Sequence, residues 1–146
     1  MNRSQIALSK FSEGYSCAQS VVFSFSDLLD ISEDTILKIT TGFGAGMGRT
    51  QNVCGTVTGA IMVLGMLYGR GINNDIENQE ITYDKVQLFL EKFNSEFQTT
   101  QCKELLRGCD LLTDKGQEEF ERLNLIETCN RCVAFAVTTL EKMISE

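Results

Sequence analysis

Apolar residues recur along most of the chain at steps of three and four, which is the spacing of one face of an α-helix. Alternating apolar and polar positions, the pattern of a half-buried strand, are absent. The chain has no proline, so glycine is its main helix breaker. The pattern predicts an all-α fold, a compact single-domain bundle of about six to eight helices over residues 1–146, with a glycine-rich helix at its centre.

Caps and breakers locate the expected helices. They are a first helix around Ile6 that ends near Gly14, a second capped by Ser16 and reaching Leu29, a third that starts after Ser32, a fourth over about Val53–Tyr68, a fifth over about Val86–Phe97, a short sixth after Cys102, a short polar seventh around Phe120, and a last over about Val133–Ile144. Residues 71–79 are polar and predict an exposed connection, and residues 108–114 predict a turn.

The segment from Thr41 to Gly48 contains too much glycine for a regular helix or strand. It predicts a loop whose backbone passes close to another group and brings amides toward the sulfur of Cys54. Successive loop amides can form a concave anion site. No strand precedes the run and no Gly-Lys-Ser/Thr follows it, which disfavours a nucleotide loop. The candidate binding positions are Gly44, Gly46, Gly48 and Gly55.

No charged residue lies between Arg49 and Arg70, and most of this segment is apolar. Its clearly apolar part is shorter than the roughly 20 residues that a membrane span needs, so we expect a buried central helix and no membrane insertion. Either arginine can stabilise a thiolate or bind an anionic substrate. Glycines four apart, at Gly55 and Gly59, would let a neighbouring helix approach closely. Such a face, if exposed, would also suit a homodimer.

Net charge restricts the class of partner. The formal charge is −7 and the pI is near 4.6, which disfavours binding to nucleic acid or to an anionic membrane. The first residues carry neither a long apolar stretch nor a small-residue cleavage site, so a secretory signal is not expected. A cytoplasmic location is then the expectation, in which structural disulfides are uncommon.

Six cysteines and no histidine define the available chemistry. Without histidine there is no Cys-His nucleophile pair, no Ser-His-Asp triad and no Cys2His2 zinc site. Four cysteines follow Ser or Thr within three residues and precede a helical pattern, so we expect them in first helical turns. There the helix dipole favours thiolate, which is both the redox nucleophile and a ligand for soft metals. These four are Cys17, Cys54, Cys102 and Cys129.

The remaining two cysteines have a simpler interpretation. Cys109 falls in the predicted turn, and Cys132 follows Cys129 by one helical turn, so both suit the filling of gaps in a core. Together Cys129 and Cys132 form a CxxC, but thioredoxin-like use would require a neighbouring βαβ pattern, which this chain lacks.

Three segments together resemble the C_GCAxxG_C_C family of redox-active proteins. They are Gly14-Tyr15-Ser16-Cys17-Ala18-Gln19-Ser20, Gly42-Phe43-Gly44-Ala45-Gly46-Met47-Gly48 and Cys54-Gly55-Thr56-Val57-Thr58-Gly59-Ala60. The resemblance extends from about Ser9 to Leu140, and the four family cysteines match the four helix-start cysteines. Thr56 stands where the family motif has alanine, which adds a hydroxyl that must find a hydrogen bond.

The cysteine pattern and the family resemblance leave three hypotheses about function open. In the first, the protein is a cytoplasmic redox protein, a candidate thiol oxidoreductase. Cys54 would attack, Cys17 would resolve, and Cys102 and Cys129 would form a second pair or an electron entry. The electron partner would be a redox protein or a small anionic molecule. In the second, the same four thiolates hold an iron–sulfur cluster or zinc. In the third, the chain is a helical interaction module with inert cysteines.

Overall fold

The computed structural model describes residues 1–145, and the all-α prediction is confirmed. Its elements are α1 (Arg3–Ser12), α2 (Cys17–Phe23), the 3-10 turn η1 (Ser26–Leu28), α3 (Glu33–Thr40), the 3-10 turn η2 (Thr41–Phe43), α4 (Gly44–Met47), α5 (Gly55–Tyr68), α6 (Ile76–Phe97), α7 (Cys102–Leu105), α8 (Asp114–Arg122) and α9 (Ile126–Ser145). The only β-type pairing among these residues is an isolated antiparallel bridge between Val53 and Gln101.

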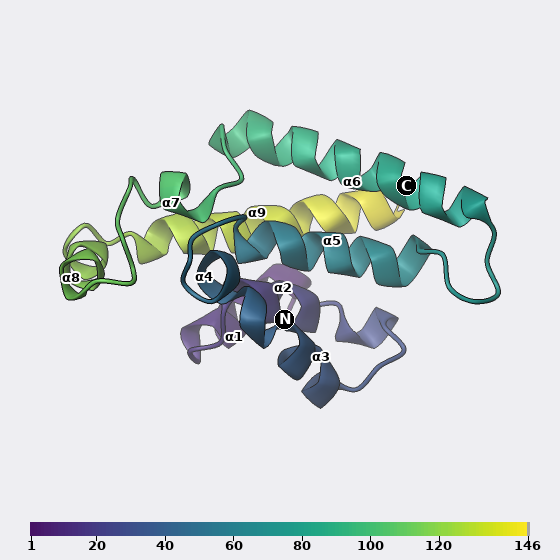
Figure 1. Cartoon of the computed structure of the whole chain (residues 1–146). Helices are drawn as coiled ribbons and strands as arrows, with labels where there is room; N and C mark the ends of the chain where they lie inside the picture. The colour runs from purple at the N-terminus through teal and green to yellow at the C-terminus, as the bar shows by residue number, and fades with distance from the viewer. Residues whose placement is uncertain (146) are drawn as a thin grey trace.

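Helix α5 lies at the centre, as the sequence predicts (Figure 1). It packs against α2 on one side and against α6 and α9 on the other, while α1 packs on α2 and α9. Its side chains Val57, Val63 and Leu64 are fully buried. The core is completed by Phe89 and Phe93 of α6 and by apolar residues of α9. Within residues 1–145, no helix combines the length and apolar character that crossing a membrane requires.

Three predicted boundaries are wrong, and the third, the start of the last helix, is described with Cys129 below. Residues 76–79 were expected at the end of a polar connection, but they form the first turn of α6, which begins at Ile76. Polarity alone does not end a helix, and no glycine or proline occurs from Ile76 to Phe97, so the polar run is the exposed side of a longer helix. Helix α2 ends at Phe23 instead of reaching Leu29, and the chain continues through η1.

The glycine-rich segment is a tight left-handed turn. Every residue from Ala45 to Arg49 has a positive φ, between 50° and 71°. The predicted close approach is found, because a Cβ on Gly46 would lie 2.7 Å from the backbone nitrogen of Asn52. A Cβ on Gly44 would lie 2.8 Å from the Cβ of Ser16. Glycine is therefore needed at both positions for the turn to pack against the starts of α2 and α5.

The glycine face of α5 is occupied within the chain itself. A Cβ on Gly55 would lie 3.1 Å from the backbone nitrogen of Ala18, and one on Gly59 would lie 3.1 Å from its carbonyl oxygen. These glycines let α2 and α5 approach closely. The homodimer expected on this face cannot use Gly55 and Gly59, because α2 already covers them.

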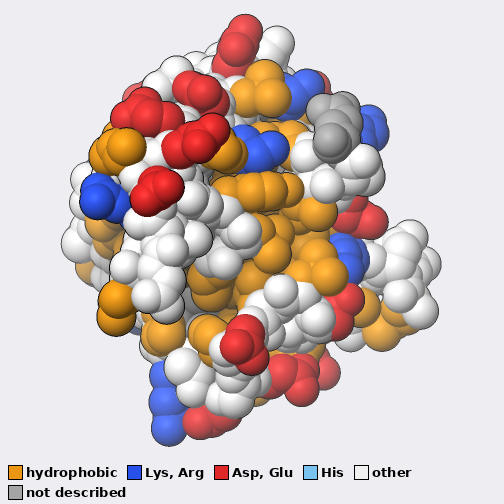
Figure 2. Space-filling view, turned by 90° about the vertical axis from the view of Figure 1, so that its right-hand side faces the viewer, with side chains coloured by type: hydrophobic (Ala, Val, Ile, Leu, Met, Phe, Trp, Pro, Cys, Tyr) orange, Lys and Arg blue, Asp and Glu red, His pale blue; other side chains and the backbone are white. Residues whose placement is uncertain are grey.

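Figure 2 shows the end of the molecule where α5 passes into α6. Acidic side chains are spread over this face, in line with the net charge of −7, and apolar side chains form a band between them. The cysteines named in the next section lie on elements at the opposite end, near α4, α7 and the start of α9 (Figure 1).

Candidate functional site: a cavity lined by thiols

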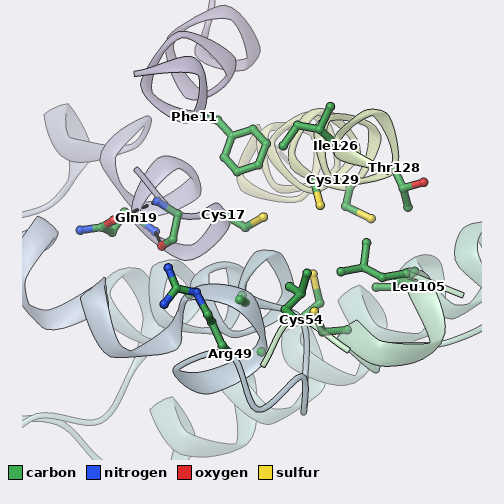
Figure 3. A pocket seen from close by; sticks show the side chains of 18 of the residues that line it. Phe11, Cys17, Gln19, Arg49, Cys54, Leu105, Ile126, Thr128 and Cys129 are labelled. Carbon is green, nitrogen blue, oxygen red and sulfur yellow. Dashed lines mark hydrogen bonds between the residues drawn. The ribbon is translucent and has the colours of Figure 1, made fainter. Parts of the chain in front are cut away.

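A cavity of about 690 Å³ lies where the first turns of α2, α5, α7 and α9 meet the left-handed turn. Five cysteines line it (Figure 3): Cys17, Cys54, Cys102, Cys129 and Cys132. All six cysteines fall within the described residues, and each is a free thiol. The four cysteines selected from the sequence thus face one cavity, together with a fifth that was expected to be core filler.

Cys17 is the first residue of α2. The Ser16 hydroxyl accepts from the backbone N–H of Gln19, and the Gln19 side chain accepts from the N–H of Ser16. This reciprocal capping box fixes the start of the helix and, with it, the position of the Cys17 thiol. The predicted serine cap is confirmed here. At the start of α5, Cys54 is itself the N-cap residue, and Gln101 has that role for α7; neither makes a side-chain capping bond.

Cys54 and Cys102 are far apart in the sequence but are joined by backbone hydrogen bonds. The N–H of Cys54 donates to Thr100 O over 2.8 Å, and the N–H of Cys102 donates to Asn52 O over 2.8 Å. These bonds flank the bridge between Val53 and Gln101. They hold the starts of α5 and α7 side by side, so both thiols reach the cavity.

Helix α9 contributes two thiols from one face. It begins at Ile126, so Cys129 is the fourth residue, and its N–H already donates to Leu125 O. The last helix was predicted over about Val133–Ile144 but begins seven residues earlier, and Cys129, which was expected in a first helical turn, lies at the end of that turn. Cys132 follows one turn later on the same side, and it also lines the cavity. The CxxC spacing was the sequence signal for Cys132, because a step of three on a helix places both thiols together.

Cys54 has the environment of a thiolate. The Cys132 thiol, by hydrogen bonding to it, lowers the pKa of Cys54 to about 7 despite burial, which acts in the opposite direction. The Thr56 hydroxyl and the backbone amides of Thr56 and Val57 lower it further. These amides belong to the first turn of α5. Cys54 is thus stabilised by its own helix, and not by amides of the glycine turn as the sequence had suggested.

The neighbouring thiols are held in the neutral form. Interaction with the Cys129 thiol, followed by burial and repulsion from Cys54, raises the pKa of Cys17. Burial, together with repulsion from Cys54 and Cys17, raises the pKa of Cys102 to about 12. Hydrogen bonding to Cys54 raises the pKa of Cys132. These shifts put Cys132 beside Cys54 and Cys129 beside Cys17, and among the thiols whose pKa is shifted, Cys54 is the one whose pKa is lowered.

A comparison with protein families agrees with these features. A family model described as "Putative redox-active protein (C_GCAxxG_C_C)" matches residues 15–143. The chain belongs to the C_GCAxxG_C_C family. No curated protein and no solved structure matches the sequence of this chain. The resemblance found in the sequence is confirmed over nearly the whole chain.

This C_GCAxxG_C_C protein departs from the family motif at Thr56, and the structure shows what surrounds the extra hydroxyl. Thr56 is completely buried, and among the described residues its Oγ1 has no hydrogen-bond partner. Its polar neighbours are the sulfurs of Cys54 and Cys17, and it lowers the pKa of both. An unsatisfied buried hydroxyl is costly, and a neighbouring thiolate would satisfy it. The Thr56 hydroxyl is therefore placed to stabilise the ionised form of the site.

Thr56→Val should move the pH dependence of Cys54 alkylation upward. Valine keeps the shape but removes the donor, so the thiolate loses stabilisation, the pKa rises, and the rate at pH 7 falls. We expect the midpoint of the rate against pH, near 7 in the native protein, to rise by about one pH unit. Thr56→Ser should keep the native midpoint. Thr58→Val is the matched control, because the Thr58 hydroxyl donates to Gly55 O. An unchanged midpoint in Thr56→Val would show that the hydroxyl has no such role.

Cys109 does not line the cavity, in agreement with its interpretation as a structural cysteine. Its thiol donates to Gly116 O over 2.7 Å, within a small second apolar cluster that includes Leu106 and Leu125. The Gln51 side chain fixes this loop, since its Nε2 donates to Cys109 O and its Oε1 accepts from Leu111 N.

The predicted glycine positions also face the cavity: Gly44, Gly46, Gly48 and Gly55 line it. Of the two arginines singled out in the sequence, Arg49 lines the cavity and Arg70 does not. In the part of the chain that the structure describes, no three Cys, Asp or Glu side chains are grouped as ligands for one metal ion.

Proposed function

We propose that the protein is a thiol-dependent redox protein in which Cys54 and Cys132 cycle between dithiol and disulfide. The observation that supports this most directly is that Cys54 and Cys132 line the same cavity as neighbours, with the Cys132 thiol lowering the pKa of Cys54. The family description, which names redox activity, supports the same class of function. The proposal keeps Cys54 as the attacking thiolate and replaces Cys17 by Cys132 as the resolving thiol, because Cys17 interacts first with Cys129.

The chemistry follows from thiol–disulfide exchange. The Cys54 thiolate attacks one sulfur of a substrate disulfide, forms a mixed disulfide and releases the other half as a thiolate, which takes up a proton. The Cys132 thiol then loses its proton and attacks Sγ of Cys54, which releases the second half as a thiol. The protein gives up two electrons and two protons, and the substrate disulfide becomes two thiols.

Cys17 of α2 and Cys129 of α9 form the second thiol pair. Cys102 lies close enough to Cys54 and Cys17 for their charges to raise its pKa. These three are proposed to exchange electrons with the first pair or with a partner, and we assign the attack itself to Cys54 alone.

One equivalent of a small disulfide should remove two thiols from the reduced protein. The expected bond joins Cys54 to Cys132, because these two thiols are neighbours and one of them ionises near neutral pH. Free-thiol titration gives the count, and peptide mapping after blocking of the remaining thiols gives the partners. A loss of two thiols with a mapped Cys17–Cys54 bond would restore Cys17 as the resolving residue. No loss of thiols would overturn the proposed function.

A further inference from the structure

We propose that Arg49 selects substrates for the thiol cavity by binding a carboxylate, so that the preferred substrate is a small disulfide that carries a negative charge. This inference rests on the proposed function and names the substrate class of the same site. Among the described residues, Arg49 is the only charged side chain that lines the cavity. The cavity contains no Asp, Glu or Lys there, although the protein has an excess of acidic residues.

The Arg49 guanidinium is available for a ligand. Within residues 1–145, the ion pairs are formed by Arg3, Lys10 and Lys38, and no hydrogen bond of the Arg49 side chain is found. The residue is exposed at the edge of the cavity. Figure 3 shows its guanidinium extending from the left-handed turn toward the side where Gln19 and Cys17 lie.

The backbone that carries Arg49 is fixed relative to Cys54. Arg49 has a φ of 69°, at the end of the left-handed turn. The N–H of Arg49 donates to Gly44 O over 3.4 Å. The N–H of Asn52, three residues later, donates to Gly46 O over 2.9 Å. Four residues lie between Arg49 and Cys54, and this short, hydrogen-bonded segment keeps the backbone of Arg49 close to Cys54 in the lining of the same cavity.

Charge and shape then define the ligand. A guanidinium binds a carboxylate through two parallel hydrogen bonds, which adds orientation to attraction. The net charge of −7 acts against an anion at long range, but salt screens it beyond about 8 Å, whereas Arg49 would contact the anion directly at the edge of the cavity. The opposite walls are apolar, with Phe11, Leu105 and Ile126 among their residues. A volume of about 690 Å³ is the size of a small-molecule site.

The reaction with such a substrate follows the same two steps, in which the protein gives up two electrons and two protons. The carboxylate of the substrate stays bound to Arg49 while the Cys54 thiolate attacks the sulfur on the same half of the molecule. The other half leaves as a thiol after protonation. Cys132 then closes the protein disulfide and releases the carboxylate-bearing half as a second thiol.

The test compares three small disulfides of similar length: dithiodipropionate, which is anionic, hydroxyethyl disulfide, which is neutral, and cystamine, which is cationic. The reduced full-length protein is mixed with each, and the rate of thiol loss is measured. The readout is the rate with dithiodipropionate divided by the rate with hydroxyethyl disulfide. This ratio does not change when the general reactivity of Cys54 changes. Arg49→Gln should lower this ratio about threefold or more, and should raise the relative rate of cystamine. Glutamine suits the backbone there, since Gln51 and Gln98 adopt the same positive φ.

Two further variants separate the role of Arg49 from a general effect of charge. Arg49→Lys keeps the cation and should retain most of the anionic preference, while Arg70→Gln removes an equal charge outside the cavity and should leave the ratio unchanged. A ratio that is the same in Arg49→Gln and the native protein would overturn the inference while leaving the proposed function intact. If the native protein reacts with none of the three disulfides, the proposed function fails and this inference fails with it.

Discussion

Cys54→Ser should remove the fast thiol reaction of the protein at pH 7. With a pKa of about 7, about half of Cys54 is thiolate at that pH, whereas a thiol with a pKa of about 12, such as Cys102, is ionised in about one molecule in 10⁵. The greater intrinsic nucleophilicity of the more basic thiolate recovers about two orders of magnitude of this difference. Cys54 should therefore react faster than Cys102 by between about two and three orders of magnitude.

The measurement is the rate of alkylation by iodoacetamide, a neutral reagent, followed by mass spectrometry of each cysteine. The serine variant should fold, since Cys54 is the N-cap of α5 and serine is a preferred N-cap residue. Cys109→Ser is the matched control, because Cys109 lies outside the cavity and should leave the fast reaction unchanged. A Cys54→Ser protein that still reacts at the native rate would show that the reactive thiolate is another residue.

Cys132→Ala should stop the reaction with a small disulfide at the mixed-disulfide stage. Alanine suits the buried position, since Cys132 is 1% exposed. Without its thiol, the adduct on Cys54 lacks the neighbour that we propose resolves it, so the adduct should persist for at least ten times longer than in the native protein. This factor is an order-of-magnitude expectation for the loss of an intramolecular thiol, whose effective concentration far exceeds that of external thiols.

The adduct is measured as a mass increase of one substrate half on the peptide that contains Cys54. Cys17→Ala is the matched variant, because Cys17 is the resolving thiol that the sequence suggested. It should leave the lifetime of the adduct near the native value. If the adduct persists in Cys17→Ala and decays normally in Cys132→Ala, the roles of the two thiols must be exchanged.

Local sequence was sufficient for much of the fold. The helical spacing of apolar residues predicted an all-α chain, and the uncharged segment before Arg70 predicted the buried central helix. Where the prediction of helix limits depended on polarity, it was wrong, as at residues 76–79. An exposed helical turn and an exposed loop share the same polar composition, so only the packing of the later part of α6 on α5 and α9 shows which one is present.

The sequence also determined which thiols to examine. Ser16 and Cys17 form a local start signal that needs nothing from the rest of the chain. Cys132 was not predicted to belong to the site, because its contact with Cys54 depends on the packing of α9 against α5. These two helices are remote from each other in the sequence. The start of α9 was predicted too late along the chain for a local reason, since residues 126–128 carry a single apolar side chain and do not show the helical apolar spacing.

By itself, the sequence determines the all-α class, the central helix and the Ser16 cap of α2, because backbone hydrogen bonds and apolar spacing act over a few residues. Only the tertiary structure decides which thiol lies beside Cys54 and that Arg49 shares its cavity. Those relations arise from the bridge between Val53 and Gln101, the close approach of Gly55 to Ala18 and the left-handed turn. The acidity of a thiol is set by the groups around its sulfur, and folding brings most of those groups from elsewhere in the chain.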